Sequence, residues 1–485
     1  KMNHRAIIST LGYIVFSIGI MMLFPLLVDI YYKEAIPEFL YPIAISIVIG
    51  SILILCFRTK KDERTIFERE ALLIVALGWL LAAIFGSLPY LFSSIPPIDS
   101  FFESMSGFTT TGSTILVDIE AHSHGLLFWR SMTQWLGGMG IIVLFLAVFP
   151  TISAGGSRLF KAEAPVLTVD RIRPKMMKTA RILWLIYILF SIIEVILLFL
   201  CKVSLYDAIC TTFSTMSTGG FHPRAESISF YKNPLVEFIV IVFMFLAGTN
   251  FSLHYRALKG DIKGFGRNKE FRLYLILILV SIGIITADLT LRIGGDILES
   301  LRFASFQVVS ITTTTGFSTV NFASNTFWTV SSRLILFILM FVGGCVGSTA
   351  GGIKNARIYI LLRSIRNEFR RILHPEAVMP VKYGKKVVPD EMLHSIFSFV
   401  ILYIILFATV ASIFFFMGYD PVTSLSSVAA TIGNVGPGFA RIGPFNNYAF
   451  FNPFAKLLLT FCMWVGRLEI FTVLIIFLPA FWRRY

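Results

Sequence analysis

Four short stretches rich in serine, threonine and glycine interrupt an otherwise apolar sequence, and long hydrophobic segments flank each of them. They are residues 106–114 (SGFTTTGST), 214–223 (STMSTGGFHP), 310–320 (SITTTTGFSTV) and 431–439 (TIGNVGPGF). Consecutive hydroxyl and glycine positions cannot form a packed core, but they can line a narrow polar passage. A chain that returns four times to such a loop is expected to fold around a fourfold pseudo-axis on which the loops meet. The natural occupant of that axis is a dehydrated cation.

The chemistry expected of these loops is coordination of a cation by oxygen. A cation entering a low-dielectric region exchanges its hydration shell for other oxygens, and a ring of backbone carbonyls with threonine hydroxyls beneath it supplies them without fixed charge. Glycine is needed because the backbone turns its carbonyls inward through φ values that side chains resist. The residues assigned to this ring are Thr110, Thr111, Gly112, Thr218, Gly219, Gly220, Thr314, Thr315, Gly316, Asn434, Val435 and Gly436.

The composition indicates where such a ring would sit. Of 485 residues, 56% are hydrophobic and only 14% are charged, against roughly 25% charged in an average soluble domain. The chain is therefore expected to be a polytopic membrane protein. Apolar runs long enough to cross about 30 Å of hydrocarbon as helix are predicted at 7–30, 40–57, 70–92, 125–149, 181–201, 234–253, 271–291, 330–362, 392–417 and 453–481.

The net charge of +14 is explained better by loop position than by binding to nucleic acid. Most Lys and Arg residues fall at the start, in loops 58–69, 158–181, 254–272 and 354–386, and in the tail, whereas residues 93–125 contain none. Because cytoplasmic loops carry the excess of Lys and Arg, both termini are expected in the cytoplasm. The first span is too long for a removed signal peptide, and the five cysteines show no metal or disulfide spacing.

From residue 70 the pattern repeats: a span, a short outer helix ending at a Thr/Gly loop, and a second span. The expected fold is an all-α membrane protein with four covalently linked helix–pore-helix–helix repeats around a pseudo-fourfold pore, plus an N-terminal helical hairpin. The boundaries are 1–69 for the hairpin and link, then 70–177, 178–269, 270–390 and 391–485 for the repeats. Asp99, Asp207 and Asp420 with Pro421 mark helix starts, and Asp296 or Ser300 does so less cleanly.

An outer helix that stops at each loop would direct its C-terminal carbonyls toward the axis. A helix C-terminus carries about half a negative charge, so four of them favour a cation. Irregular backbone at membrane depth is tolerated only where it is buried or lines water. The loops are therefore expected to face a pore.

Residues 343–352 (GGCVGSTAGG) hold five glycines inside the predicted span 330–362. Close packing of helices through small residues is one interpretation. The other is an unwound segment lying across the pore, because each glycine costs up to about 1 kcal/mol in a helix relative to alanine. A phosphate-binding loop is excluded by spacing, since Gly352 is followed by Ile353 before Lys354.

These loops, together with FVGGCVGSTAGGIKNAR at 341–357 and GRLEIF at 466–471, resemble the TrkH branch of the Trk/Ktr/HKT superfamily of potassium transporters over nearly the whole chain. The resemblance implies a channel-like subunit of the bacterial cytoplasmic membrane, with potassium as transported substrate, no covalent cofactor, and one filter glycine per repeat. It implies an intramembrane gating loop comprising Gly343, Gly344, Gly347, Ser348, Thr349, Gly351 and Gly352. It also implies a homodimer and a cytosolic TrkA-type nucleotide-binding regulatory ring docked on the basic cytoplasmic stretches.

The four loops differ from one another, and Asn434, Val435 and Pro437 make the fourth the least similar. Unlike strands should form fewer well-shaped sites, so we predict that potassium and rubidium pass readily while sodium is excluded less strictly.

Arg467 lies near the middle of the last span, where a cation costs roughly 2.5–3.5 kcal/mol. We expect it to line the cavity below the ring, as an electrostatic barrier or by holding the gating loop; structural pairing with Glu194 is the alternative. Glu103 receives no specific role from the sequence, because a solvated surface explains it as well as a cation-attracting mouth.

Two other function classes compete with gated conduction. A secondary transporter coupling potassium to protons or sodium would need a titratable residue at mid-membrane, and Glu194 and Asp288 are the candidates. An ATP-driven pump, the enzyme alternative, would need a sizeable soluble domain, and the sequence shows none. We therefore expect no enzymatic activity.

Overall fold

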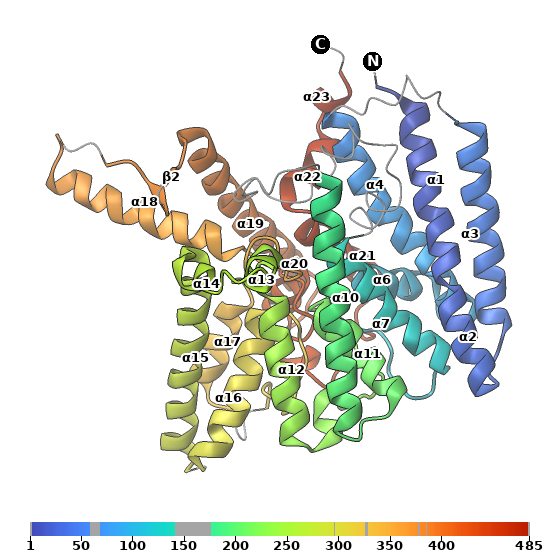
Figure 1. The fold of residues 1–485 in the computed structure, drawn as a ribbon, viewed down its shortest axis with the longest axis horizontal. Coiled ribbons are helices and arrows are strands. Elements are labelled where there is room, and N and C mark those ends of the chain that lie inside the picture. Colours follow the sequence, from blue (N-terminus) through green and yellow to red (C-terminus); the bar gives the residue numbers. More distant parts are fainter. Residues whose placement is uncertain are drawn as a thin grey trace.

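The computed structural model describes residues 2–58, 68–140, 176–294, 296–324, 328–376, 379–384 and 386–483, which form a body of packed helices (Figure 1). Within these ranges the only sheet is a small antiparallel hairpin of Lys382–Tyr383 (β1) and Lys386–Val387 (β2). The predicted all-α membrane fold is thereby confirmed.

The N-terminal hairpin packs beside the first repeat (Figure 1). It consists of α1 (His4–Met21), α2 (Leu23–Tyr32) and α3 (Pro37–Cys56). α1 lies along α3 and against α4 (Glu68–Gly86), while α2 lies against α7 (His124–Met139). The close approach of α1 and α3 needs glycine, since a Cβ on Gly50 would lie 2.7 Å from the backbone nitrogen of Phe16.

Four units then follow in the order entering helix, short helix, loop and returning helix. The first has α4 with α5 (Leu88–Phe92), then α6 (Pro97–Phe108) and α7, and the second has α10 (Met176–Leu200), α11 (Leu205–Met216) and α12 (Pro234–Ala247). The third has α15 (Lys269–Ile293), α16 (Ile297–Thr312) and α17 (Val330–Leu339), and the fourth has α19 (Asp390–Phe416), α20 (Pro421–Ile432) and α21 (Pro453–Arg467). The connecting helices are α13 (Phe251–Leu258), α14 (Lys263–Arg267), α18 (Asn355–Leu373), α22 (Ile470–Leu474) and α23 (Pro479–Trp482), with the short turns η4 (Ser227–Tyr231), η5 (Ala440–Ile442) and η6 (Ile475–Phe477).

Each returning helix begins at a residue whose side chain accepts a hydrogen bond from a first-turn N–H. The pairs are Ser123 with Leu126 (3.2 Å), Asn233 with Leu235 (3.0 Å), Thr329 with Ser332 (3.1 Å) and Asn452 with Ala455 (2.8 Å). Such caps satisfy backbone donors that the helix itself leaves free. The sequence therefore fixes the start of all four returning helices by the same local chemistry.

The starts of the short helices agree only partly with the prediction. Asp420 caps α20, accepting from the N–H of Thr423 at 2.9 Å; burial raises the pKa of this carboxyl group, but its hydrogen bonds with Thr423 outweigh burial and leave the pKa below the ordinary value. Asp99 and Asp207, however, lie in the first turn of their helices, where an acidic side chain faces the positive end of the helix dipole. Ser204 is the cap of α11, and Asp296 precedes α16 without a side-chain cap bond.

Several predicted spans are not single straight helices. Among the described residues, six helices are long and apolar enough to cross a membrane, or up to eight if two bent pairs count as one span each. The bends are 100° between α12 and α13 and 117° between α21 and α22. The predicted span 330–362 is wrong as one helix, because α17 ends at Leu339 and α18 begins at Asn355. The end of span 125–149, most of loop 158–181 and most of link 58–69 lie outside the described residues.

Candidate functional site

The four Thr/Gly loops meet as a closed ring. A Cβ added to Gly112 would collide with the carbonyl oxygen of Gly219, one on Gly220 with that of Thr315, one on Gly316 with that of Val435, and one on Gly436 with that of Thr111, all at 2.6 Å or closer. In each loop, the carbonyl oxygen just before the ring glycine therefore lies against the ring glycine of another loop. That other loop is the one from the preceding repeat, and for loop 1 it is loop 4. The contacts run through the repeats in chain order and return to the first, so the structure brings together the ring glycines of all four repeats and the residue before each of them.

The backbone of the four loops is nearly the same despite their different sequences. The first ring residue has a φ of 52° at Thr110, 54° at Thr218, 59° at Thr314 and 54° at Asn434. The third is a glycine with a φ of 83° at Gly112, 80° at Gly220, 81° at Gly316 and 99° at Gly436. Threonine or asparagine adopts a positive φ at the first position, but at the third a Cβ would also meet a carbonyl oxygen of the neighbouring loop, so glycine is required there.

Each short helix supports its loop in the same way. The helix ends two residues before the first ring residue, and the N–H of the second ring residue donates to a carbonyl five residues earlier, at 2.8–2.9 Å. The donors and acceptors are Thr111 to Ser106, Gly219 to Ser214, Thr315 to Ser310 and Val435 to Ala430. The partly negative helix ends are thus directed at the ring from four sides, as the sequence predicts.

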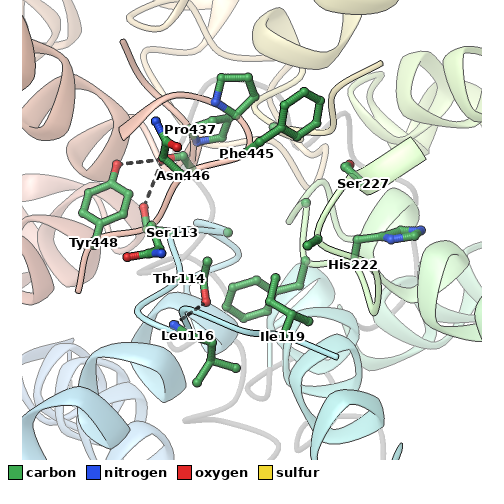
Figure 2. A pocket seen from close by; sticks show the side chains of 18 of the residues that line it. Ser113, Thr114, Leu116, Ile119, His222, Ser227, Pro437, Phe445, Asn446 and Tyr448 are labelled. Carbon is green, nitrogen blue, oxygen red and sulfur yellow. Dashed lines mark hydrogen bonds between the residues drawn. The ribbon is translucent and has the colours of Figure 1, made fainter. Parts of the chain in front are cut away.

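On one side of the ring lies a cavity of about 80 Å³ lined by all four ring glycines (Figure 2). Ser113 and Tyr448 both donate to the carbonyl of Gly436, at 3.1 and 2.8 Å. Figure 2 places His222 and Ser227 across the cavity from Tyr448. We call this cavity the outer mouth, because it lies where the chain leaves the ring in each repeat.

The fourth loop has its own contacts, which sequence reasoning did not identify. Asn434 donates through Nδ2 to the hydroxyl of Thr111 at 2.9 Å and to the carbonyl of Met463 at 3.1 Å. It therefore ties loop 4 to loop 1 and to the returning helix α21. The amide replaces the threonine found at this position in the other three loops while keeping the same backbone conformation.

The glycine-rich segment 340–354 lies directly against the ring on the side opposite the outer mouth. The N–H of Gly351 donates to the hydroxyl of Thr314 at 2.7 Å, and a Cβ on Gly351 would be 2.9 Å from that of Asn434. The Thr349 hydroxyl contacts the carbonyls of Met216 and Ala247 at 3.0 and 3.2 Å. The five glycines therefore lie in an unwound segment and not in a helix that packs closely against another helix.

The bend between α12 and α13 also forms backbone hydrogen bonds with the glycine-rich segment. The N–H of Cys345 donates to the carbonyl of Gly248 at 2.9 Å, and the N–H of Phe251 donates to that of Gly347 at 3.0 Å. Repeat 2 thus holds the loop that repeat 3 contributes.

Arg467, at the end of α21, forms hydrogen bonds with both the glycine-rich segment and the end of α7. Its guanidinium donates to the carbonyl of Thr349 at 2.7 Å and to those of Gly137 and Gly138, at the end of α7, at 3.0 and 3.2 Å. No basic side chain pairs with either carboxyl oxygen of Glu194 among the described residues. The contact with the glycine-rich segment is therefore present, and the Arg467–Glu194 ion pair is not.

Two acidic residues near this segment have contacts that the sequence does not predict. Glu270, in the first turn of α15, accepts through one oxygen from the N–H groups of Val346 and Ala356, at 2.7 and 3.1 Å, and so links the middle of the segment to the first turn of α18. Glu469 pairs with Arg357 of α18. A single acid in the first turn of a span carries no sequence signal that would have revealed these two contacts.

His222 in the outer mouth is held neutral. Burial, together with the nearby guanidiniums of Arg224 and Arg130, lowers its pKa to about 3. Its ring contacts the hydroxyls of Thr211 and Tyr231, each at 3.2 Å. The outer mouth therefore carries no titrating imidazole near neutral pH.

Comparisons with known proteins agree with this geometry. The family model described as "Cation transport protein", TrkH, matches residues 35–484. The chain is 37% identical to the Trk system potassium uptake protein TrkH of Salmonella typhimurium and 35% identical to the Trk system potassium uptake protein TrkG of Escherichia coli, over 99–100% of each chain. It also superposes on the crystal structure of the potassium transporter TrkH from Vibrio parahaemolyticus with a TM-score of 0.89, at 32% identity over 99% of this chain and 100% of that one. The four-loop ring and the segment beneath it thus belong to a multi-pass membrane protein of the TrkH family of cation transport proteins.

Proposed function

We propose that this protein takes up potassium across the cytoplasmic membrane through a gated, channel-like pore. The observation that carries the proposal is the closed ring, in which four carbonyl-bearing loops of one chain surround a single axis. Carbonyl oxygens replace the hydration shell of potassium, and four converging helix ends favour its charge. Relatives at 35–37% identity over their full length are named potassium uptake proteins.

In this proposal the potassium filter consists of the twelve ring residues, one triplet from each repeat. They are Thr110, Thr111 and Gly112; Thr218, Gly219 and Gly220; Thr314, Thr315 and Gly316; and Asn434, Val435 and Gly436. Rubidium is expected to pass as well. The asymmetry of the fourth triplet supports weaker exclusion of sodium than four identical loops would give.

The gate is the segment at 343–352, held by Arg467. The support for this is its position against Thr314 and Asn434 on the inner side of the ring, together with its anchoring to the bends of repeats 2 and 4. A polypeptide segment in that position blocks the axis, so ions pass only when it moves.

The orientation follows from charge and from the position of the ends. Both termini lie at one end of the molecule (Figure 1). The alternation of the predicted spans assigns most of the Lys- and Arg-rich loops to the same side as the termini. With this end in the cytoplasm the outer mouth faces outward. An inside-negative potential then favours entry by about 2.3 kcal/mol per charge for each 100 mV.

The partners in this proposal are a second copy of the chain and a cytosolic TrkA-type nucleotide-binding ring. The support is family membership and the helix α18, which extends from the helical body with Arg366, Arg370 and Arg371 exposed (Figure 1). Nucleotide control would come from that ring, which docks on such basic surfaces.

Recording from purified protein in planar bilayers tests the function. We expect potassium and rubidium currents with rates far above transporter turnover, and reversal potentials that favour potassium over sodium. A strong preference for sodium or for an anion would contradict the proposal.

One observation favours the ion-coupled alternative enough to include it in the test. Glu194 is a fully buried carboxyl group, and no basic side chain pairs with it among the described residues. Asp288 is a weaker candidate, because it already pairs with Arg292 at 2.8 Å and accepts from Ser332 at 2.6 Å. Flux at transporter rates that depends on a proton gradient and is lost in Glu194→Gln would favour coupling.

A further inference from the structure

One buried ion pair breaks the fourfold pattern around the outer mouth. Nine residues before the ring glycine, the four short helices carry Glu103, Thr211, Gln307 and Ser427. Seven residues after the cap, the four returning helices carry Arg130, Val240, Leu336 and Leu459. All eight positions are buried. Repeat 1 therefore has a carboxylate and a guanidinium where the other repeats have uncharged side chains.

Glu103 accepts hydrogen bonds from the chain segment that follows the ring in repeat 1. Its side chain accepts from the N–H of Ile115 at 2.9 Å and from the hydroxyl of Thr114 at 2.9 Å. Arg130 Nε donates to the same carboxylate at 2.8 Å, and the two side chains are 1% and 0% exposed. The carboxylate is therefore satisfied by one charged and two neutral donors.

Arg130 reaches from this pair to repeat 2. Its Nη1 donates to the carbonyl of His222 at 3.4 Å, and its Cζ lies 4.2 Å from the centre of the Phe221 ring. Arg130 also lines the outer mouth, together with the four ring glycines. One side chain thus connects the segments that follow the ring in repeats 1 and 2, at the wall of the outer mouth.

A guanidinium at this wall is unfavourable for a cation pathway unless its charge is neutralised. A second guanidinium, that of Arg224, also lines the mouth, and it too is paired with a carboxylate of a short helix, Asp207, at 3.2 Å. Charges of one sign that line a cleft with low-dielectric walls change the local concentration of ions by one to three orders of magnitude. Removing one partner of a buried pair leaves the other charge uncompensated.

We propose that Glu103 is a positioning residue for ion entry: it neutralises Arg130 at the outer mouth and so keeps the approach to the ring open to cations. The inference rests on the proposed potassium uptake and deepens it by assigning the control of entry to a single pair. Arg130 supplies the tie between repeats 1 and 2, and Glu103 makes that tie compatible with a passing cation.

The test is potassium uptake by liposomes containing the purified full chain. Glu103→Gln is expected to raise the external potassium concentration for half-maximal uptake on the order of tenfold at low ionic strength, with a smaller effect on the maximal rate. The double variant Glu103→Gln with Arg130→Gln should return close to the wild-type value.

Glu237→Gln is the matched control. Glu237 pairs with Arg302 at 2.6 Å between α12 and α16, and neither residue lines the outer mouth. Its loss should leave the half-maximal concentration unchanged. If Glu103→Gln fails to assemble, Asp207→Asn carries the test, with a smaller rise expected because Arg224 is 32% exposed.

Two outcomes overturn the inference: a shift as large in the double variant as in Glu103→Gln, or no shift in Glu103→Gln. Should Asp207→Asn have to carry the test, the absence of a rise has the same meaning. The proposed function fails separately, and visibly, if the wild-type protein itself shows no saturable potassium uptake in the same liposomes.

Discussion

Replacing Arg467 by glutamine tests whether this side chain holds the gate closed. The guanidinium donates to the carbonyl of Thr349 at 2.7 Å, within the segment that lies against the ring. A hydrogen bond to a charged group contributes about 1.5–3 kcal/mol. Losing about 2 kcal/mol changes the equilibrium between the seated and displaced segment by roughly thirtyfold, since 1.4 kcal/mol is tenfold. We therefore expect unstimulated potassium flux to rise toward thirtyfold at most.

Arg467→Lys separates the two ways in which the residue could act. Lysine retains the charge but lacks the planar fork that reaches several carbonyls at once. If the charge itself is the barrier, the lysine variant keeps a low flux while the glutamine variant does not; if the hydrogen bonds are decisive, both variants leak. The assay is rubidium efflux from liposomes, normalised to the amount of protein in the membrane. Unchanged flux in Arg467→Gln, accompanied by poor assembly, would show that the residue is structural.

Three further predictions follow from the ring and its surroundings. Gly220→Ala should abolish uptake, because alanine at a φ of 80° is strained by about 1–2 kcal/mol and its Cβ would meet the carbonyl of Thr315; Gly283→Ala, at a helical glycine with open space around it, should leave uptake intact. Thr349→Val removes two hydroxyl contacts with backbone carbonyls, and should raise unstimulated flux less than Arg467→Gln does, since a neutral hydrogen bond contributes about 1 kcal/mol. His222 has a folded pKa of about 3, below its ordinary value of 6.5. The unfolded chain therefore binds the proton more readily, and thermal stability should fall below pH 6.5 by about 1.4 kcal/mol per pH unit in the wild type, with that slope missing in His222→Gln.

Much of the fold was visible in the sequence because it rests on local chemistry. The hydroxyl and glycine triplets predict the loops, since their backbone needs positive φ at two defined positions. Asp420 followed by Pro421 predicts the start of α20 for the same kind of reason. The five glycines at 343–352 indicate an unwound segment, and the structure breaks the helix there.

What the sequence did not reveal depends on contacts between distant parts of the chain. Glu270 clamps residues 76 and 86 positions further on, and nothing in its own neighbourhood indicates this. Glu103 reads as a solvated acid until α7 places Arg130 beside it. The bend after Gly248 is stabilised by backbone bonds to the segment from repeat 3, and a helix propensity cannot anticipate such partners.

The ring is made of four separate stretches of a single polypeptide, and this has a practical consequence. In an assembly of identical subunits one codon change alters every quadrant of the ion path together, whereas here it alters one quadrant and leaves three as internal references. Facing positions can be changed singly and then jointly, so their coupling is measurable without mixing subunits. Asn434 and Thr111, which touch across two quadrants, are the natural first pair for such a cycle.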